Sequence, residues 1–137
     1  MNRIKYDSDS IKLITLFESM TGAKVKDLIA GEKLIFIIKE GEMGKAIGKN
    51  GVNIKRMEDK LKKKIRLIEF SNDVLQFIKN VIHPLEASDI KNDGGIINIY
   101  GKDVHTKSMM VGREHQNINN LKDIVKRYFE INEIKVL

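Results

Sequence analysis

The 137-residue sequence contains no cysteine, no tryptophan and only one proline. The lack of cysteine excludes disulfide bonds and cysteine-ligated zinc, so the fold has to rely on its apolar core. No apolar run approaches the roughly 18 residues that a membrane-spanning helix needs, and the first residues lack a signal-like apolar segment. We therefore expect a soluble, cytoplasmic protein that makes no membrane contact.

The sequence also lacks the motifs of common enzyme classes. A P-loop would need Gly-x-x-x-x-Gly-Lys followed by serine or threonine, and the glycines have no such spacing. The histidines, His83, His105 and His115, are too scattered to suggest metal ligands, and no nucleophile, base and orienting acid occur together. We expect no catalysis, no cofactor, no metal ion and no small-molecule substrate.

The sequence does contain a glycine turn that leads directly into a helix-like segment. Gly48 and Gly51 enclose two polar residues, and Ile54, Met57 and Leu61 then recur at helical spacing. Two glycines allow another backbone to approach closely, and the start of a helix offers free N–H groups and partial positive charge. The turn predicts a phosphate-binding loop, although a plain tight turn between two helices has the same pattern.

A second, partial copy of this pattern lies 64 residues further along the chain. Ile47-Gly48-Lys49 corresponds to Val111-Gly112-Arg113, and Asn53-Ile54 corresponds to Asn117-Ile118. The same offset relates apolar positions upstream and downstream of the turn. The chain is therefore interpreted as two tandem copies of one module, with boundaries at 8–71 and 72–137.

Each copy has the pattern helix, strand, strand, helix, glycine turn, helix, strand. The first copy is expected to comprise a helix capped by Ser8-Asp9-Ser10 and stopping at Gly22, strands at 25–30 and 33–39, helices at 42–47 and 52–63, and a strand at 65–70. The second is expected to comprise a helix capped at Asp73 and ending by Pro84, strands at 85–91 and 96–100 around Asn92-Asp93-Gly94-Gly95, a helix at 103–111, a helix through Tyr128, and a last strand beginning at Phe129.

The positive charge is concentrated in one region. The chain carries a net charge of +6, and residues 44–66 alone hold nine lysines and arginines against two acidic residues. A solvated helix face explains Lys60–Lys64 as well as a binding role does, whereas Lys45 and Lys49 flank the turn where an anion would lie. A basic surface at this turn would attract nucleic acid and make its binding salt-dependent.

These motifs resemble a known family of RNA-binding modules. The strings Ile47-Gly48-Lys49-Asn50-Gly51 and Val111-Gly112-Arg113-Glu114-His115-Gln116-Asn117-Ile118, in this order of elements, resemble the prokaryotic, type II KH domain. Two such modules in tandem resemble the NusA family of transcription termination and antitermination factors, above all its short archaeal members. The resemblance implies an α+β fold in which each module is a three-stranded mixed sheet covered on one face by helices.

The same resemblance implies a non-enzymatic transcription factor that binds single-stranded nascent RNA and modulates termination, antitermination and elongation. RNA polymerase is a further implied partner, for which no residue is assigned. In KH modules the glycine loop clamps about four nucleotides, and a neighbouring apolar groove receives their bases. The implied RNA-binding residues of the first copy are Lys45, Ile47, Gly48, Lys49, Asn50, Gly51, Ile54 and Lys55. Those of the second copy are Val111, Gly112, Arg113, Glu114, His115, Gln116 and Asn117.

Some of these residues have alternative roles. Ile54 and Ile118 are expected to serve the core more than the groove, and Asn117 suits helix capping as well as RNA contact. The second copy departs from the KH pattern because His115 replaces the second glycine and Glu114 brings a carboxylate near the phosphates. His115 could instead donate to a phosphate when protonated. We expect the second loop to be the weaker site.

Two other functions remain open from the sequence. Ribosomal proteins and ribosome-assembly factors also carry this kind of KH module, although the duplicated module favours the NusA family. A protein-interaction module with glycine loops that are only turns is the third interpretation, and the excess positive charge argues against it.

Overall fold

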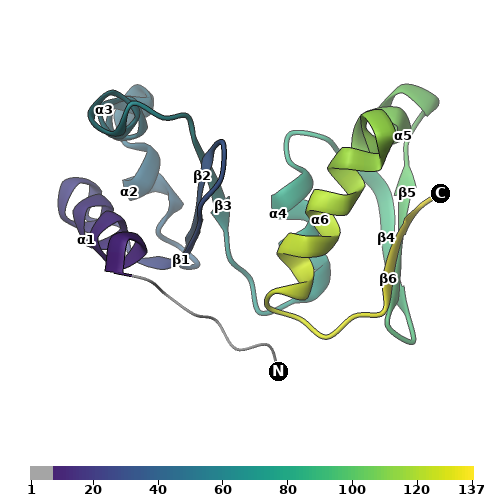
Figure 1. Cartoon of the computed structure of the whole chain (residues 1–137). Coiled ribbons are helices and arrows are strands. Elements are labelled where there is room, and N and C mark those ends of the chain that lie inside the picture. The colour runs from purple at the N-terminus through teal and green to yellow at the C-terminus, as the bar shows by residue number, and fades with distance from the viewer. Residues whose placement is uncertain (1–7) are drawn as a thin grey trace. The chain divides into compact units, whose positions relative to one another are not determined.

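The computed structural model describes residues 8–137, which form two compact units divided between Ser71 and Asn72. The first unit comprises the described residues 8–71 and the second comprises 72–137. Both contain the predicted order of helix, strand, strand, helix, glycine turn, helix and strand (Figure 1). The predicted α+β class, with a three-stranded mixed sheet in each module, is confirmed.

In the first unit, strand β2 lies at the centre of the sheet. It pairs antiparallel with β1 and parallel with β3. The three helices cover one face of this sheet (Figure 1). The elements are α1 (Ser8–Thr21), β1 (Val25–Ile29), β2 (Leu34–Ile38), α2 (Met43–Ile47), the 3₁₀ turn Lys49–Gly51, α3 (Val52–Leu61) and β3 (Ile65–Glu69).

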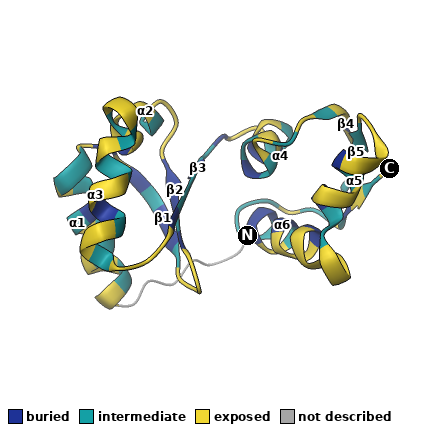
Figure 2. Ribbon diagram, turned by 90° about the horizontal axis from the view of Figure 1, so that it is seen from above, coloured by how far each residue is buried: buried dark blue, intermediate teal, exposed yellow. Residues whose placement is uncertain are grey.

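The core of the first unit lies between β2 and these helices. Phe36 on β2 is fully buried, and its ring stacks on that of Phe17 from α1, with ring centroids 4.3 Å apart. Met57 is the fully buried residue of α3 and belongs to the same cluster. Each helix therefore presents its buried stripe to the sheet and its polar side to solvent (Figure 2).

The second unit repeats this topology, with β5 between antiparallel β4 and parallel β6. Asp73 caps the first helix by accepting the N–H of Leu75 at 3.0 Å, as predicted. The elements are α4 (Val74–Ile82), β4 (Ala87–Asp93), β5 (Ile96–Gly101), α5 (Val104–Val111), the 3₁₀ turn Arg113–His115, α6 (Gln116–Lys126) and β6 (Glu133–Val136).

The last strand begins later than predicted. Helix α6 ends at Lys126, and the N–H groups of Tyr128 and Phe129 both donate to the carbonyl of Val125, so these residues form a turn. Their rings pack against Phe77 of α4, with centroid distances of 5.7 and 5.6 Å. This turn and its two ring contacts occupy the residues where the strand was predicted, and the strand begins at Glu133, so the 64-residue offset does not extend to β6.

The start of α1 and the end of β4 also differ from the prediction. Helix α1 begins at Ser8, so Ser8, Asp9 and Ser10, which were expected to precede and cap the helix, form its first turn. Strand β4 continues through Asp93, because Gly94 and Gly95 by themselves make the reversal. Both glycines have positive φ, 61° and 93°, which is the conformation of a two-residue hairpin turn.

Replacing Phe36 with alanine should destabilise the first unit by about 3–5 kcal/mol, because the substitution removes a fully buried ring and its stacking contact with Phe17. Chemical denaturation followed by circular dichroism would measure the change. Ile11→Ala, at a side chain that is 53% exposed, is the control and should cost less than about 0.5 kcal/mol. Similar losses in both variants would contradict the proposed position of the core.

Candidate nucleic-acid interface

The two glycine turns have the same backbone conformation although their sequences differ. Gly48 and Gly112 have φ/ψ values of 75°/169° and 77°/171°. Two residues later Asn50 and Glu114 are both left-handed, at 57°/26° and 54°/31°. The shared geometry confirms that the repeat seen in the sequence is a structural repeat at these turns.

Glycine is required at the first position of each turn for two reasons. The φ/ψ values of Gly48 and Gly112 fall in a region that only glycine occupies without strain. A Cβ built on Gly48 would lie 2.8 Å from Cγ of Asn53, and one on Gly112 would lie 2.6 Å from Cγ of Asn117. Each turn is therefore in close contact with an asparagine side chain.

These asparagines brace the two turns. Nδ2 of Asn53 donates to the carbonyl of Lys45 at 2.8 Å, and Nδ2 of Asn117 donates to the carbonyl of Met109 at the same distance. Each bond ties the helix that follows the turn to the helix that precedes it. The alternative role proposed for Asn117, helix capping, is wrong, because α6 has no side-chain cap.

Asn53 was not among the predicted site residues, although the sequence carried a signal for it. The same residue type recurs 64 positions later, five residues after the first glycine of each turn. A brace needs a side-chain amide at that distance from the glycine, and an asparagine in both copies satisfies this requirement. The signal was visible in the repeat, but the partner carbonyl could only be identified in the folded chain.

His115 occupies the position of Gly51 without changing the course of the backbone. Its φ/ψ values are 63°/19°, against 75°/17° for Gly51, so both residues are left-handed. Histidine is one of the non-glycine residues that tolerate this region. The two turns differ in surface chemistry, because Arg113 and Glu114 are exposed where the first turn exposes Lys49 and Asn50.

The predicted apolar site residues lie beside the turns. Ile47 is 40% exposed and Val52, which was not predicted, is 46% exposed; they flank the first turn. Ile54 is half-buried and packs against the core cluster, so its expected core role is confirmed. In the second unit, Val111 and Gly112 line an open surface pocket of about 330 Å³ together with Lys107, Ser108 and Val136.

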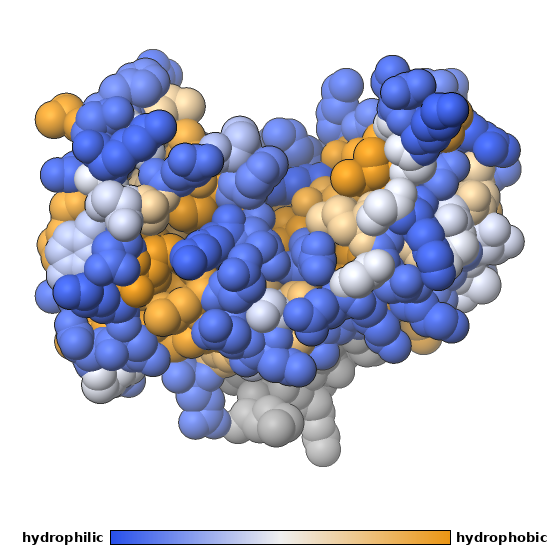
Figure 3. All heavy atoms as spheres, turned by 180° about the vertical axis from the view of Figure 1, so that it is seen from behind, coloured by the Kyte–Doolittle hydropathy of each residue, from blue (hydrophilic) through white to orange (hydrophobic). Residues whose placement is uncertain are grey.

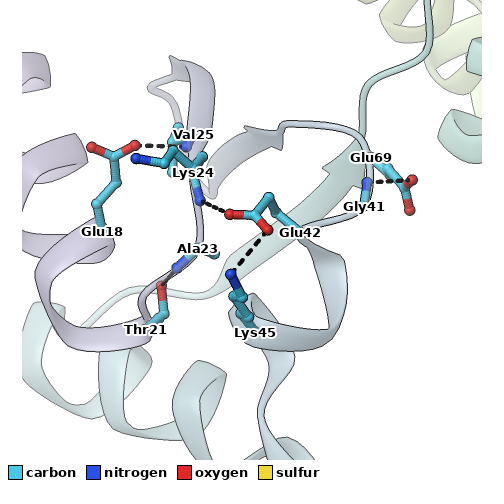
Figure 4. Close-up of polar contacts among 9 residues, drawn as sticks. All are labelled: Glu18, Thr21, Ala23, Lys24, Val25, Gly41, Glu42, Lys45 and Glu69. Atoms are coloured by element: carbon cyan, nitrogen blue, oxygen red, sulfur yellow. Dashed lines mark hydrogen bonds and ion pairs between the residues drawn. The ribbon is translucent and has the colours of Figure 1, made fainter.

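The predicted polar residues differ in how far their side chains are engaged. Lys49 and Lys55 are exposed, as are Gln116 and Asn117. Lys45 instead forms an ion pair with Glu42, with Nζ and Oε2 3.3 Å apart (Figure 4). The hydrogen bond from Lys45 is the main cause that lowers the pKa of Glu42, and the backbone N–H of Lys24 adds to the effect.

The helices that follow the glycine turns begin without side-chain caps. Gly51 and His115 occupy the N-cap positions of α3 and α6, and neither helix has a capping side chain. By contrast, Asp73 and Asp103 cap α4 and α5. The N–H groups of Val52 and Gln116 donate to the carbonyls of Lys49 and Arg113 within the 3₁₀ turns. The N–H groups that follow them at the start of each helix need an outside acceptor, which water or an anion can supply.

The described residues contain neither a metal-binding cluster nor a membrane-spanning helix. Within 8–137, no group of three or more histidine, aspartate or glutamate side chains is placed to bind a metal ion. In the same part of the chain, no helix combines the length and the apolar character needed to cross a membrane.

Comparisons with known proteins agree with this geometry. The KH domain model matches residues 13–85, more than half of the chain. A "Probable transcription termination protein NusA" from Methanococcus vannielii is 43% identical over 140 residues, covering 98% of this chain and 80% of that protein. This chain belongs to the NusA family.

Other archaeal NusA-named proteins give the same result. The protein from Methanocaldococcus jannaschii is 32% identical and covers 100% of this chain, which spans 77% of that relative. The one from Thermoplasma acidophilum is 30% identical over 99% of this chain and 97% of its own length. The crystal structure of APE1850 shares the fold, with a TM-score of 0.77, 24% identity, and coverage of 96% of this chain and 100% of that one. The family predicted from the glycine motifs, NusA, is confirmed.

The glycine turn of this NusA-family chain should not tolerate alanine at its first position. Gly48→Ala should cost about 2 kcal/mol, because the new Cβ would meet Asn53 and the backbone would be strained. Gly44→Ala, four residues earlier, is the matched control: it lies in α2 with open space around it and should be neutral or slightly stabilising. Thermal unfolding of both variants would measure the difference, and equal stabilities would contradict the contact described here.

Proposed function

We propose that this chain is an RNA-binding transcription factor of the NusA family that holds single-stranded nascent RNA on its glycine turns. Membership of the family and the KH domain match support the class of function. The observation that carries the proposed site is the uncapped, asparagine-braced glycine turn that occurs twice with one geometry. We assign one KH domain to residues 8–71 and a second to 72–137.

The first turn is the stronger of the two proposed sites. Gly51 has no side chain that would keep an RNA backbone at a distance, and the uncapped start of α3 offers the N–H groups that follow Val52 to a phosphate. Lys49 and Asn50 project into solvent at the tip of the turn, so both are available to that phosphate. The exposed apolar side chains of Ile47 and Val52 give neighbouring bases a surface to lie against.

The second turn should hold RNA more weakly. Arg113 supplies a forked donor for phosphate, but Glu114 places a carboxylate where the first turn has the neutral Asn50. His115 adds a side chain at the point of closest backbone approach. The open surface pocket beside Val111 and Gly112 has room for a base. We therefore expect this unit to contribute to base contacts more than to phosphate binding.

We further propose that the chain acts without catalysis, in the cytoplasm, with RNA polymerase as its protein partner. A role in the ribosome or in ribosome assembly is the alternative for a KH protein, and the NusA-named relatives favour transcription. Affinity purification from cells would separate the two. Recovery of RNA polymerase would support the transcription role, and recovery of small ribosomal subunits in its place would overturn it.

RNA binding should depend mainly on the first turn. Lys49→Asp combined with Asn50→Asp should remove most of the affinity for short single-stranded RNA, because two carboxylates would face the phosphates. Arg113→Asp combined with Glu114→Asp should remove less, because this turn is already partly acidic. Fluorescence-anisotropy titrations at several salt concentrations would measure both effects.

These two double variants also serve as controls for each other. They alter the same two positions of turns that have one backbone geometry. The first variant lowers the net charge by three and the second by two, so a general effect of charge would reduce binding in roughly that proportion, whereas the proposal expects a much larger difference between them. Unchanged affinity in both variants would refute the proposal for both turns.

Removing the charge of Glu42 should strengthen RNA binding. Glu42→Gln releases Lys45 from its ion pair, while the amide oxygen can still accept the N–H of Lys24. The freed lysine adds about one phosphate contact, so the affinity should rise several-fold at low salt and less at high salt. Glu40→Gln, at an exposed residue two positions earlier, is the control of equal charge. An equal rise in the two variants would show that only net charge matters.

A further inference from the structure

A line of positive side chains continues from the first turn along α3. Lys49 lies in the turn, and Arg56 and Lys60 stand four residues apart on α3, the spacing of one helical side, while Lys64 follows the end of the helix. Arg56 and Lys60 are exposed on α3, and Lys64 is exposed between α3 and β3. We call Arg56, Lys60 and Lys64 the α3 stripe. Helix α3 has ten residues, so the stripe carries positive charge about 15 Å away from the turn.

The charges of the α3 stripe are not neutralised within the unit. Among the described residues, none of its three members has an ion pair or a hydrogen bond from its side chain. The acidic neighbour Glu58 is engaged elsewhere, because its Oε2 accepts the N–H of Ile65 at 2.9 Å. Nearby Lys63 is fixed by a 2.9 Å bond to the carbonyl of Gly31 and does not belong to the stripe.

The second unit shows that the fold does not require this charge. Its helix α6 follows a turn of the same geometry, yet Asn120, Ile124 and Tyr128 stand 64 positions after the three stripe residues. Over the equivalent segment, 108–130, there are four lysines and arginines and three acidic residues, against nine and two in 44–66. A solvated helix face alone would not explain a difference of this size between two copies of one module.

We propose that the α3 stripe binds the phosphates of a second RNA segment, adjoining the nucleotides held at the first turn. The inference rests on the proposed function, since it extends the RNA path beyond the glycine turn. Phosphate binding requires only accessible positive charge, whereas a protein interface needs an apolar centre. The exposed large apolar residues of this unit, Ile11, Ile47 and Val52, lie outside 55–64. Seen from behind, the surface of the chain is largely hydrophilic, with hydrophobic patches between the polar side chains (Figure 3).

RNAs of two lengths distinguish the stripe from the turn. The full chain would be titrated with single-stranded RNAs of about 6 and about 16 nucleotides, chosen to cover the turn alone or the turn with its neighbours. The stripe variant is Arg56→Asn/Lys60→Gln/Lys64→Gln. The matched control, Lys39→Gln/Lys79→Gln/Lys102→Gln, removes three positive charges from exposed sites outside α3. Circular dichroism would verify that both triple variants are folded.

The stripe variant should bind the short RNA within about twofold of wild type and lose the extra affinity for the long one. A plot of log affinity against log salt has a negative slope, and loss of three phosphate contacts should make this slope less steep by about 2 for single-stranded RNA. Between 50 and 200 mM salt, wild-type affinity for the long RNA should therefore fall about 20-fold more than that of the stripe variant. The lysine control should keep the wild-type slope.

Other outcomes would overturn the inference in distinguishable ways. Equal slopes in the stripe variant and the wild type on the long RNA would refute the stripe while leaving the turn intact. Equal losses on both RNA lengths would make the stripe part of the same short site. Loss of a co-purified acidic protein with an unchanged RNA slope would assign the stripe to a protein partner. No RNA binding by wild type at either length would refute the proposed function itself.

Discussion

The structure of each unit depends on one close contact, between the first glycine of the turn and the asparagine five residues later. Gly48 and Gly112 adopt a conformation that only glycine takes without strain, and each leaves room for an amide that bridges two helices. The bridge fixes how the helix after the turn leaves it. Under the proposed function, the N–H groups that follow Val52 and Gln116 at the start of that helix are the ones offered to a phosphate.

The two units share this scaffold and differ in the chemistry placed on it. The first turn is followed by a lysine-rich helix whose polar side is open to solvent, whereas the second displays Glu114 and His115 and is followed by asparagines. Because the backbone of the two turns is the same, the difference lies in the side chains: their charge, and the added bulk of His115 in place of Gly51. Under the proposed function, the duplicated module divides its work: the first copy holds phosphates and the second adds apolar contact near Val111.

Several features could be predicted because they depend on local patterns. Apolar spacing located the helices and strands, Asp73 marked a helix start, and the repeated turn identified the family. The errors occurred where distant contacts decide. The last strand was predicted to begin at Phe129, because the 64-residue offset takes Ile65, the first residue of β3, to Phe129. In the structure, the rings of Tyr128 and Phe129 pack on Phe77. Local pattern carries no information about a partner fifty residues away.

The sequence by itself determined the duplicated order of elements, the basic character of the first copy and the family, because periodicity, charge and the glycine spacing are properties of neighbouring residues. Only the tertiary structure decided that His115 keeps the conformation of Gly51, that Asn117 braces the turn and does not cap the helix, and that Lys45 is paired with Glu42. The asparagine brace depends on a contact that folding makes between two helices, and the other two facts depend on backbone angles and side-chain positions. A one-dimensional pattern contains none of these quantities.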